Sequence, residues 1–320
     1  MEKNTRFEKT LFGMNKARRK KFWFYLAFIA FPMLHYLVFY VYININSFIL
    51  SFREYYIDDS VNKLVFKFSE FANFAEAFKI LGEKASYIWT SLLMLAIQLF
   101  VTTPLALLFS FYIYKKGPGT ELFRVMLFLP SVLSAVVFGV LYVHISNEVI
   151  PWIQTELFHA EEGVKFLDNQ GTQMFAVILF NILLGFGVSV LTYSGTMSGI
   201  NISLIESAEL DGANHVKEFF YIVVPMIWPT VVTLMIVSFS RVFTDQWQVY
   251  TLLSETASGN PVANLGYYLY VSALRGDFLK SEYHPAYSVL SALGLILTAI
   301  VLPLTLVMRW ALNKFGPKAD

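Results

Sequence analysis

Cysteine is absent from this sequence of 320 residues. Disulfide bonds, iron–sulfur clusters and thiolate metal sites are therefore excluded. The five histidines are scattered and form no His-x-x-x-His pair, so their spacing indicates no metal site. The dipeptide Gly-Lys does not occur either, which excludes a phosphate-binding P-loop on this chain.

Charged residues are also scarce. They make up 15% of the chain, whereas soluble domains carry roughly 25%. Hydrophobic residues make up 56% and the mean hydropathy is +0.55. This balance indicates a lipid bilayer as the surroundings of the chain. The net charge of +1 gives no indication of a nucleic-acid partner.

Six segments are each long enough to cross a bilayer, which requires about 20 apolar residues. They lie at about 22–50, 87–113, 123–146, 174–195, 222–244 and 286–312. The sequence therefore predicts an all-α, polytopic membrane protein with six transmembrane helices. Small residues in the fourth segment, Gly185, Gly187 and Ser189, are expected to let helices approach closely. The long outer segments, at about 51–86, 147–173 and 245–285, are expected to form folded caps or amphipathic helices.

Positive charge predicts the orientation of the chain. Residues 1–21 form a basic tail that ends in Lys16, Arg18, Arg19, Lys20 and Lys21. Such a cluster beside a membrane span holds the N-terminus in the cytosol. With six spans, the C-terminus is then also cytosolic, and residues 22–320 form one multi-pass transmembrane domain. The same topology places a loop at about 196–225 on the cytosolic side.

That loop contains the most polar interruption of the hydrophobic chain, from Glu206 to Pro225. Carboxylates alternate with apolar residues up to Leu210, and Asp211-Gly212 is a strong signal for a helix end and a turn. A second amphipathic piece follows, with Val216, Phe219, Phe220 and Val223 spaced to share one face. The expected object is a helix, a turn and a helix across the inner mouth of the bundle, a shape suited to docking into a groove of another protein.

The residues of this loop resemble the EAA loop of binding-protein-dependent ABC importers. The resemblance rests on Glu206-Ser207-Ala208, Asp211-Gly212-Ala213, Phe219, Ile222 and Pro225. The family pattern is E-A-A-x-x-D-G-A, followed by Phe, Ile and Pro in this register. Ser207 departs from the usual Ala, and Ser203 stands where a Pro commonly precedes the motif. Residues 123–137 and 183–213 are also similar to sugar-importer permeases, and the beginning of the chain looks like the larger permease of maltose transporters.

The resemblance implies a type I ABC importer transmembrane domain that serves sugar transport in the cell membrane of a prokaryote. The chain would be a transporter subunit rather than an enzyme, with no cofactor of its own, because ATP and Mg²⁺ would bind to a separate pair of ATPase subunits. A second permease subunit would complete the path, and an extracytoplasmic binding protein would deliver a carbohydrate, in particular an oligosaccharide. The ATPase-coupling residues would be Glu206, Ser207, Ala208, Asp211, Gly212, Ala213, Phe219 and Pro225.

Polar residues within or near membrane spans are functional candidates by default. Here they suggest a substrate path of Asn181, Arg241, Asp245, Gln246, Trp247 and Tyr250. Two purely structural interpretations stay open. Arg241 pairs with Asp245 one turn further along the helix, and Trp247 and Tyr250 belong to the interfacial aromatic belt rather than stacking on a sugar. After the fifth span, the sequence FTDQW (243–247) departs from the Phe-Asp pair often found in the family.

Three alternatives to a sugar importer remain at this stage. The first is a permease of the same superfamily for a non-sugar solute, such as a glycerol phosphodiester or a modified peptide. The second is an ion-driven secondary transporter, which matched broken helices in inverted repeats would favour, although the sequence shows none. The third is a membrane scaffold that transports nothing.

Overall fold

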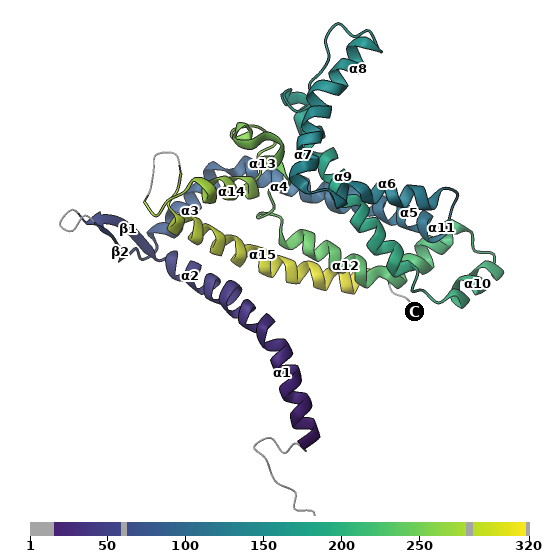
Figure 1. Ribbon diagram of the computed structural model, residues 1–320, viewed down its shortest axis with the longest axis horizontal. Coiled ribbons are helices and arrows are strands. Elements are labelled where there is room, and N and C mark those ends of the chain that lie inside the picture. Colours follow the sequence, from purple (N-terminus) through teal and green to yellow (C-terminus); the bar gives the residue numbers. More distant parts are fainter. Residues whose placement is uncertain (1–15, 59–62, 280–283, 318–320) are drawn as a thin grey trace, which may run out of the picture.

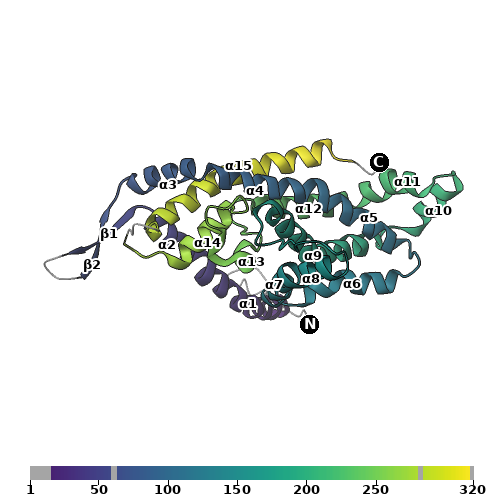
Figure 2. The ribbon, with the colours of Figure 1, turned by 90° about the horizontal axis from the view of Figure 1, so that it is seen from above.

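The computed structural model describes residues 16–58, 63–279 and 284–317, so most of the predicted basic tail lies outside the described residues. The described part of the chain is predominantly helical and elongated, with a β-hairpin at one end and helix α10 at the other (Figure 1). Figure 2 shows the same polarity from above, with the C-terminal end of α15 on the side of α10 and α11.

Six helical stretches are long and apolar enough to cross a membrane, which confirms the predicted number. They are Lys20–Leu50, Ala85–Tyr114, Ala135–Glu156, Gln170–Met197, His215–Ser240 and Tyr287–Phe315. Several are composite because π-helical turns (η) interrupt them. The first is built from α1 (Lys16–Tyr36), η1 (Leu37–Tyr42) and α2 (Ile43–Leu50), and the second from α4 (Ala85–Ile97), η2 (Gln98–Thr102) and α5 (Thr103–Tyr114).

The remaining stretches follow the same plan. The third contains α7 (Ala135–His144), η3 (Ile145–Val149) and α8 (Ile150–Glu156), and the fourth is the single helix α9 (Gln170–Met197). The fifth contains α11 (His215–Glu218), η4 (Phe219–Val223) and α12 (Val224–Ser240), and the sixth is α15 (Tyr287–Phe315). Between them lie α3 (Ala72–Glu83), α6 (Thr120–Val132), α10 (Ile202–Leu210), α13 (Val249–Leu253), the 3₁₀ turn η5 (Ser254–Ala257) and α14 (Leu265–Arg275).

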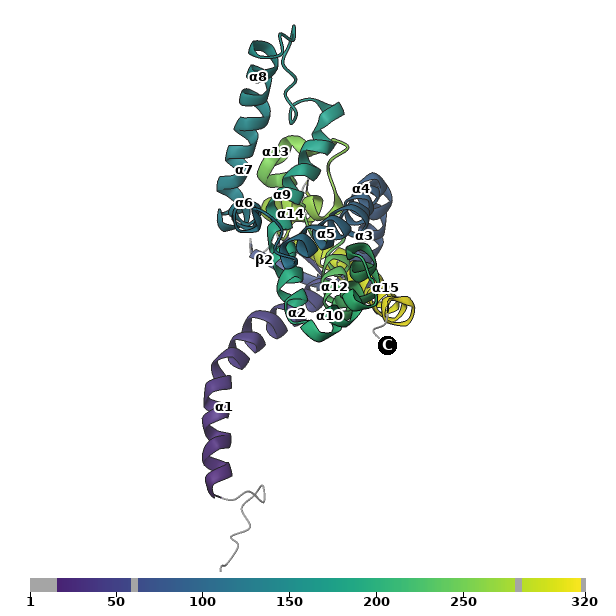
Figure 3. The ribbon, with the colours of Figure 1, turned by 90° about the vertical axis from the view of Figure 1, so that its right-hand side faces the viewer.

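The third predicted span, 123–146, is not one helix. It is divided between α6 and α7, because Leu133 and Ser134 have extended backbone conformations. Pro130 lacks the N–H that would continue the hydrogen bonding of α6. The Ser134 hydroxyl accepts a hydrogen bond from the backbone N–H of Val137 at 3.2 Å and thereby caps the start of α7. The helix α6 packs along α5 and α9, and α7 packs against α13 and α9, whereas α8 projects from the bundle (Figure 3).

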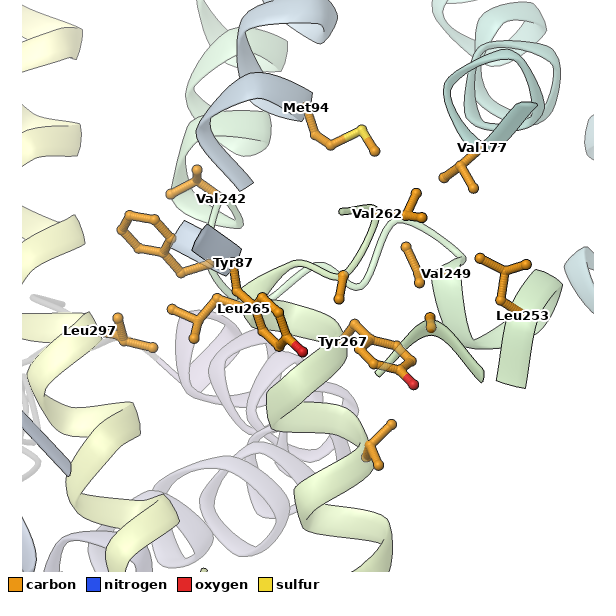
Figure 4. Close-up of a cluster of buried hydrophobic side chains, with 14 of the residues drawn as sticks. Tyr87, Met94, Val177, Val242, Val249, Leu253, Val262, Leu265, Tyr267 and Leu297 are labelled. Carbon is orange, nitrogen blue, oxygen red and sulfur yellow. The ribbon is translucent and has the colours of Figure 1, made fainter. Parts of the chain in front are cut away.

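The outer segment 245–285 was expected to fold as a cap or an amphipathic helix, and much of it lies inside the bundle. Helices α13 and α14 contribute buried side chains to the larger of two apolar clusters, together with α4, α9 and α15 (Figure 4). Hydrogen bonds from α4 hold this segment in place: Thr90 donates to the carbonyl of Pro261 at 3.0 Å, and the Ser91 hydroxyl accepts from the N–H of Leu265 at 3.1 Å.

A two-stranded antiparallel hairpin interrupts the all-helical pattern. The strands β1 (Arg53–Asp58) and β2 (Lys63–Phe68) pair from Arg53 opposite Phe68 to Asp58 opposite Lys63. The buried amide of Asn73 on α3 joins the base of the hairpin to the helices, because it donates to the carbonyls of Ser51 at 2.8 Å and Arg53 at 2.9 Å. The hairpin is thus tied to the end of the molecule that lies opposite α10.

The first span stands apart from the other five. Its most apolar stretch has no residue buried in the structure, and the side chains described along α1 are exposed or nearly so. Its second half, α2, contacts α15. Figures 1 and 3 show α1 diverging from the bundle as a single rod.

Candidate functional site

The predicted docking loop forms a helix, a turn and a helix at one end of the molecule (Figure 1). The side chain of Asn201 caps the start of α10 by accepting a hydrogen bond from the N–H of Ser203 at 3.1 Å. The helix stops at Asp211, and Gly212 then adopts a left-handed conformation with φ of 79°. Glycine adopts this conformation without steric cost, so the Asp-Gly signal in the sequence correctly located the turn.

Helix α10 turns most of its side chains away from the protein. Ile205, 5% exposed, is the buried residue of this helix, whereas Leu210 is 89% exposed. Glu206, Ser207, Asp211 and Gly212 are exposed as well, and Ala208 and Ala213 are half-buried. The end of the molecule therefore presents apolar side chains and carboxylates together on one short helix.

The other two predicted coupling residues, Phe219 and Pro225, lie inside the protein rather than on its surface. Phe219 and Pro225 are both buried, and Phe219 packs in the second apolar cluster, which joins α5, α9, α10 and α12. The prediction that Val216, Phe219, Phe220 and Val223 share one face is wrong. Phe219 and Val223 are buried, whereas Val216 and Phe220 are exposed. The second amphipathic piece also continues into the fifth span through the π-helical turn η4.

Sequence reasoning missed the polar contact that holds α10 in place. The ammonium nitrogen of Lys115, directly after α5, lies 2.8 Å from Oε2 of Glu218 on α11 and 3.3 Å from Oε1 of Glu209 on α10. Burial acts to lower the pKa of Lys115, but hydrogen bonds to Glu218 and Glu209 outweigh this effect and raise the pKa above its ordinary value. No local sequence pattern predicts this ionic cluster, because Lys115 and Glu218 are far apart in the chain and come into contact only after folding.

Five of the six predicted substrate-path residues form one connected group. Asn181 on α9 donates a hydrogen bond to the carbonyl of Trp247 at 2.7 Å, and a side-chain oxygen of Asp245 accepts from the N–H of Trp247 at 2.8 Å. A side-chain oxygen of Gln246 accepts from the N–H of Tyr250 at 3.2 Å. Asn181, Asp245, Gln246, Trp247 and Tyr250 therefore lie together around a single turn after α12.

This turn has an unusual backbone. Trp247 and Gln248 have φ of 49° and 54°, a left-handed conformation that non-glycine residues rarely adopt. Residues in such conformations cost about 1–3 kcal/mol each and are concentrated at functional sites. Gly266 on α14 lies against the turn, since an added Cβ there would meet the carbonyl of Asp245 and lie 2.9 Å from the nitrogen of Gln246.

Arg241 is separate from this group. Helix α12 ends at Ser240, so Arg241 belongs to the following turn, where its side chain is exposed. The suggested ion pair with Asp245 is not found among the described residues; the link between the two is a backbone hydrogen bond from Asp245 N to Arg241 O at 2.9 Å.

A small cavity of about 10 Å³ lies beside Asn181 and Trp247. Gln98 and Thr102 of the second span line it as well. Within the described ranges, the hydroxyl of Thr102 and the indole N–H of Trp247 are buried without a hydrogen-bond partner. Because a buried polar group without a partner is costly, these two atoms mark a place able to receive a small polar group.

The charged side chains do not converge on a metal site. Across residues 16–58, 63–279 and 284–317, no group of three or more His, Cys, Asp or Glu residues is placed to hold a metal ion. The candidate site consists of two parts, the predicted docking loop at one end of the bundle and a polar turn within the bundle.

Comparison with known proteins gives concordant matches. The profile of the family described as "Binding-protein-dependent transport system inner membrane component" matches residues 80–320. An arabinooligosaccharides transport system permease protein, AraP of Bacillus subtilis, is 25% identical over 86% of this chain and 84% of its own length. An sn-glycerol-3-phosphate transport system permease protein, UgpA of Yersinia pestis, is 27% identical over 75% of this chain and 79% of its own.

The fold is shared with a solved structure. One chain of a bacterial ABC transporter involved in the import of the acidic polysaccharide alginate superposes with a TM-score of 0.73 at 18% identity. The match covers 93% of this chain and 97% of that one. At this identity the likeness concerns the fold alone, and it includes the helical bundle that carries both parts of the candidate site.

Proposed function

Because this chain belongs to the family of binding-protein-dependent transport system inner membrane components, we propose that it is the membrane-spanning subunit of an ATP-driven importer of carbohydrate. A separate pair of ATPase subunits supplies the energy, a second permease completes the path, and an extracytoplasmic binding protein delivers the solute. The family and the six apolar helices make the chain a multi-pass membrane protein. The chain itself carries the path and the docking helix, and does not hydrolyse ATP.

The observation that carries this proposal is the exposure of α10. Apolar side chains that are exposed together mark an interaction surface. On α10, Leu204 is 45% and Leu210 89% exposed, beside the exposed carboxylates of Glu206 and Asp211. An amphipathic helix with outward apolar anchors is suited to a groove in a partner. Glu206, Ser207, Ala208, Asp211, Gly212 and Ala213 are the docking residues in this proposal, and Phe219 and Pro225 support them from within the bundle.

Orientation follows from the same assignment. An ATPase that consumes cellular ATP requires α10 in the cytosol, in agreement with the basic residues expected there. The C-terminal end of α15 lies on the same side of the molecule as α10 (Figure 2), so we place the C-terminus, and with six spans the N-terminus, in the cytosol of a prokaryotic cell. The β-hairpin and α3 then face the binding protein.

The polar turn supports a neutral, hydroxyl-rich solute. Gln246, Trp247 and Tyr250 bring an amide, an indole and a phenol to the turn, groups that bind sugar hydroxyls or stack on sugar rings. The amide nitrogen of Asn181 already donates to the carbonyls of Val177 and Trp247, so Asn181 contributes by holding the turn. Cations are common partners of a phosphate group, and the cation among the predicted path residues, Arg241, lies directly after α12 and outside the turn at 245–248. The named substrates of AraP and UgpA represent the two alternatives, and the turn favours the carbohydrate, an oligosaccharide, over the phosphorylated glycerol.

Replacement of Gly212 tests the docking role. No atom lies within 4 Å of an added Cβ at Gly212, so the side chain of Gly212→Trp has open space in which to block a partner. The φ of 79° strains the backbone of any variant at this position, and the control therefore has to carry the same strain. We expect the variant to remain in the membrane and to lose ATP-driven uptake. Gly119→Trp is the matched control, because Gly119 also has a left-handed φ, of 75°, and open space around it.

Two further measurements separate the alternatives. Uptake that continues after the ion gradients are collapsed, while ATP is maintained, supports the ATP-driven importer; its loss under these conditions indicates a secondary transporter. Competition of labelled arabino-oligosaccharide uptake with unlabelled sn-glycerol 3-phosphate then tests the solute class. Uptake of the phosphate ester in place of the oligosaccharide contradicts the carbohydrate assignment, and wild-type uptake by Gly212→Trp contradicts the docking role.

A further inference from the structure

Three elements meet at the ammonium group of Lys115. This residue directly follows the second span. Its nitrogen lies 3.3 Å from Oε1 of Glu209 on α10 and 2.8 Å from Oε2 of Glu218, at the start of the fifth span. One cation therefore joins the docking helix to two membrane spans.

The pair with Glu218 is buried. The side chain of Glu218 is 1% exposed and that of Lys115 is 23% exposed. The second oxygen of Glu218, Oε1, is buried without a hydrogen-bond partner among the described residues. His215 approaches Oε2 at 3.5 Å from an exposed position. Lys115 is thus the main compensation for a buried negative charge, and loss of one partner of such a pair is strongly unfavourable.

The remaining attachment of α10 is slight. Ile205 is its buried side chain, and it packs in the cluster formed by α5, α9 and α12. Apart from the chain connections at its two ends, α10 is therefore held to the bundle by one apolar anchor and by the Glu209–Lys115 contact. A displacement of α10 acts on the second span through Lys115, and reaches the fifth span through Glu218.

We propose that Lys115 is a positioning residue for energy coupling, which transmits the displacement of α10 to the second and fifth spans. This inference rests on the proposed function of α10 as the docking helix. Lys115 also donates a hydrogen bond to Oε1 of Glu209 at 3.3 Å. Because hydrogen bonds are directional, this contact restricts the angle of α10 to the bundle more than the packing of a single aliphatic side chain does. Without it, a partner still binds α10, but part of the movement is lost in rotation of α10 on its linkers.

The experiment uses the full importer, with the ATPase pair, the second permease and the binding protein, reconstituted in liposomes. Its readout is the number of solute molecules taken up per ATP hydrolysed. Lys115→Met removes the cation with its length retained. Lys116→Met is the matched control, since the adjacent Lys116 is exposed and forms no ion pair among the described residues. Lys115→Arg tests rescue by another cation.

We expect Lys115→Met to reduce uptake per ATP by about 2- to 30-fold, the range for residues that carry coupling between distant sites. Lys116→Met and Lys115→Arg retain the wild-type ratio. Lys115→Met also leaves an isolated carboxylate and is able to lower the amount of folded subunit, so Lys115→Met combined with Glu218→Gln provides a second variant without buried charge. The combined variant regains wild-type abundance in the membrane but keeps the reduced ratio.

A merely structural ion pair gives a different pattern. If the combined variant has both wild-type abundance and a wild-type ratio, the pair only stabilises the fold and the inference is wrong. Equal ratios for Lys115→Met and Lys116→Met lead to the same conclusion. These results are distinguishable from failure of the proposed function, in which the wild-type protein shows no ATP-driven uptake or Gly212→Trp has no effect on it.

Discussion

The close approach of α9 to α6 leads to a prediction with an internal control. An added Cβ at Gly187 would meet the carbonyl oxygen of Leu127, and would lie 2.7 Å from the carbonyl carbon of Leu127 and 2.9 Å from Cα of Phe128. These atoms belong to the backbone of α6 and do not rotate away as side-chain atoms do. At Gly185, two residues earlier on the same helix, no atom lies within 4 Å.

The expected magnitude follows from two opposing effects. Alanine is favoured over glycine inside a helix by about 1 kcal/mol, and this gain is common to Gly185→Ala and Gly187→Ala. Overpacking costs about 1–3 kcal/mol, and only Gly187→Ala incurs it. The difference in free energy of unfolding between the two variants therefore isolates the steric cost. Because the contact is with backbone, we expect a difference near the upper end, about 2–3 kcal/mol.

Thermal unfolding of the purified subunit in detergent measures this difference. Tryptophan fluorescence is recorded at one heating rate for both variants, because irreversible unfolding makes the midpoint depend on the rate. Gly187→Ala should unfold at a lower temperature than the wild-type protein, and Gly185→Ala at the same temperature or a higher one. Coincident unfolding curves for the two variants would refute the close approach of α9 to α6.

Three further predictions concern the polar turn and the ionic cluster. Gly266→Ala should push the turn at Asp245 away from α14 and lower the apparent affinity for solute, measured as uptake normalised to the amount of subunit in the membrane. Asn181→Ala should lower the free energy of unfolding by about 1–3 kcal/mol in a denaturant titration, because it leaves the carbonyl of Trp247 without its partner. The pKa of Lys115 is raised in the folded protein. The ion pair is therefore fully formed below the pKa of the unfolded state, and it is lost only as the pH rises through the higher pKa of the folded state. Uptake per ATP should accordingly stay constant from about pH 7.5 to about pH 9.5, and a decline within this window in the wild-type protein but not in Lys115→Arg would contradict the assignment.

Long apolar runs made the membrane spans predictable. A helix in a bilayer satisfies its own backbone groups, so length and hydropathy alone identify it. The same signal does not locate a break inside an apolar run. The division of 123–146 at Leu133 and Ser134 depends on a local cap and on packing of α6 against α9, and neither leaves a trace in hydropathy.

The docking loop shows the same division between local and long-range information. Asp211-Gly212 predicted the turn because the φ of 79° at Gly212 is a local property. Helical spacing assigned Val216 and Phe220 to the face of Phe219 and Val223, and this was wrong, because only Phe219 and Val223 pack in the second apolar cluster, which is formed with distant helices. The Lys115 cluster was missed entirely, since it requires knowledge of which helix ends lie side by side.

The segment after the fifth span was the least predictable. Its polar and aromatic residues suggested a cap outside the membrane or a substrate path, and the structure packs Leu265 and Tyr267 into the largest apolar cluster (Figure 4). The turn at Trp247 depends on Asn181 from α9 and on Gly266 from α14. Such a convergence of distant residues is visible only in three dimensions.

The free-standing first span makes this protein convenient for distance measurements. The chain contains no cysteine, so any introduced cysteine is the unique attachment point for a spin label or fluorophore. A label at Phe28 on α1, 77% exposed, or at Phe315 at the end of α15, 73% exposed, would disturb neither apolar cluster. The pair Phe28→Cys and Phe315→Cys thus places one probe on the rod beside the bundle and one at the end of the bundle near α10 (Figure 2), where relative movement can be recorded without removing a native thiol.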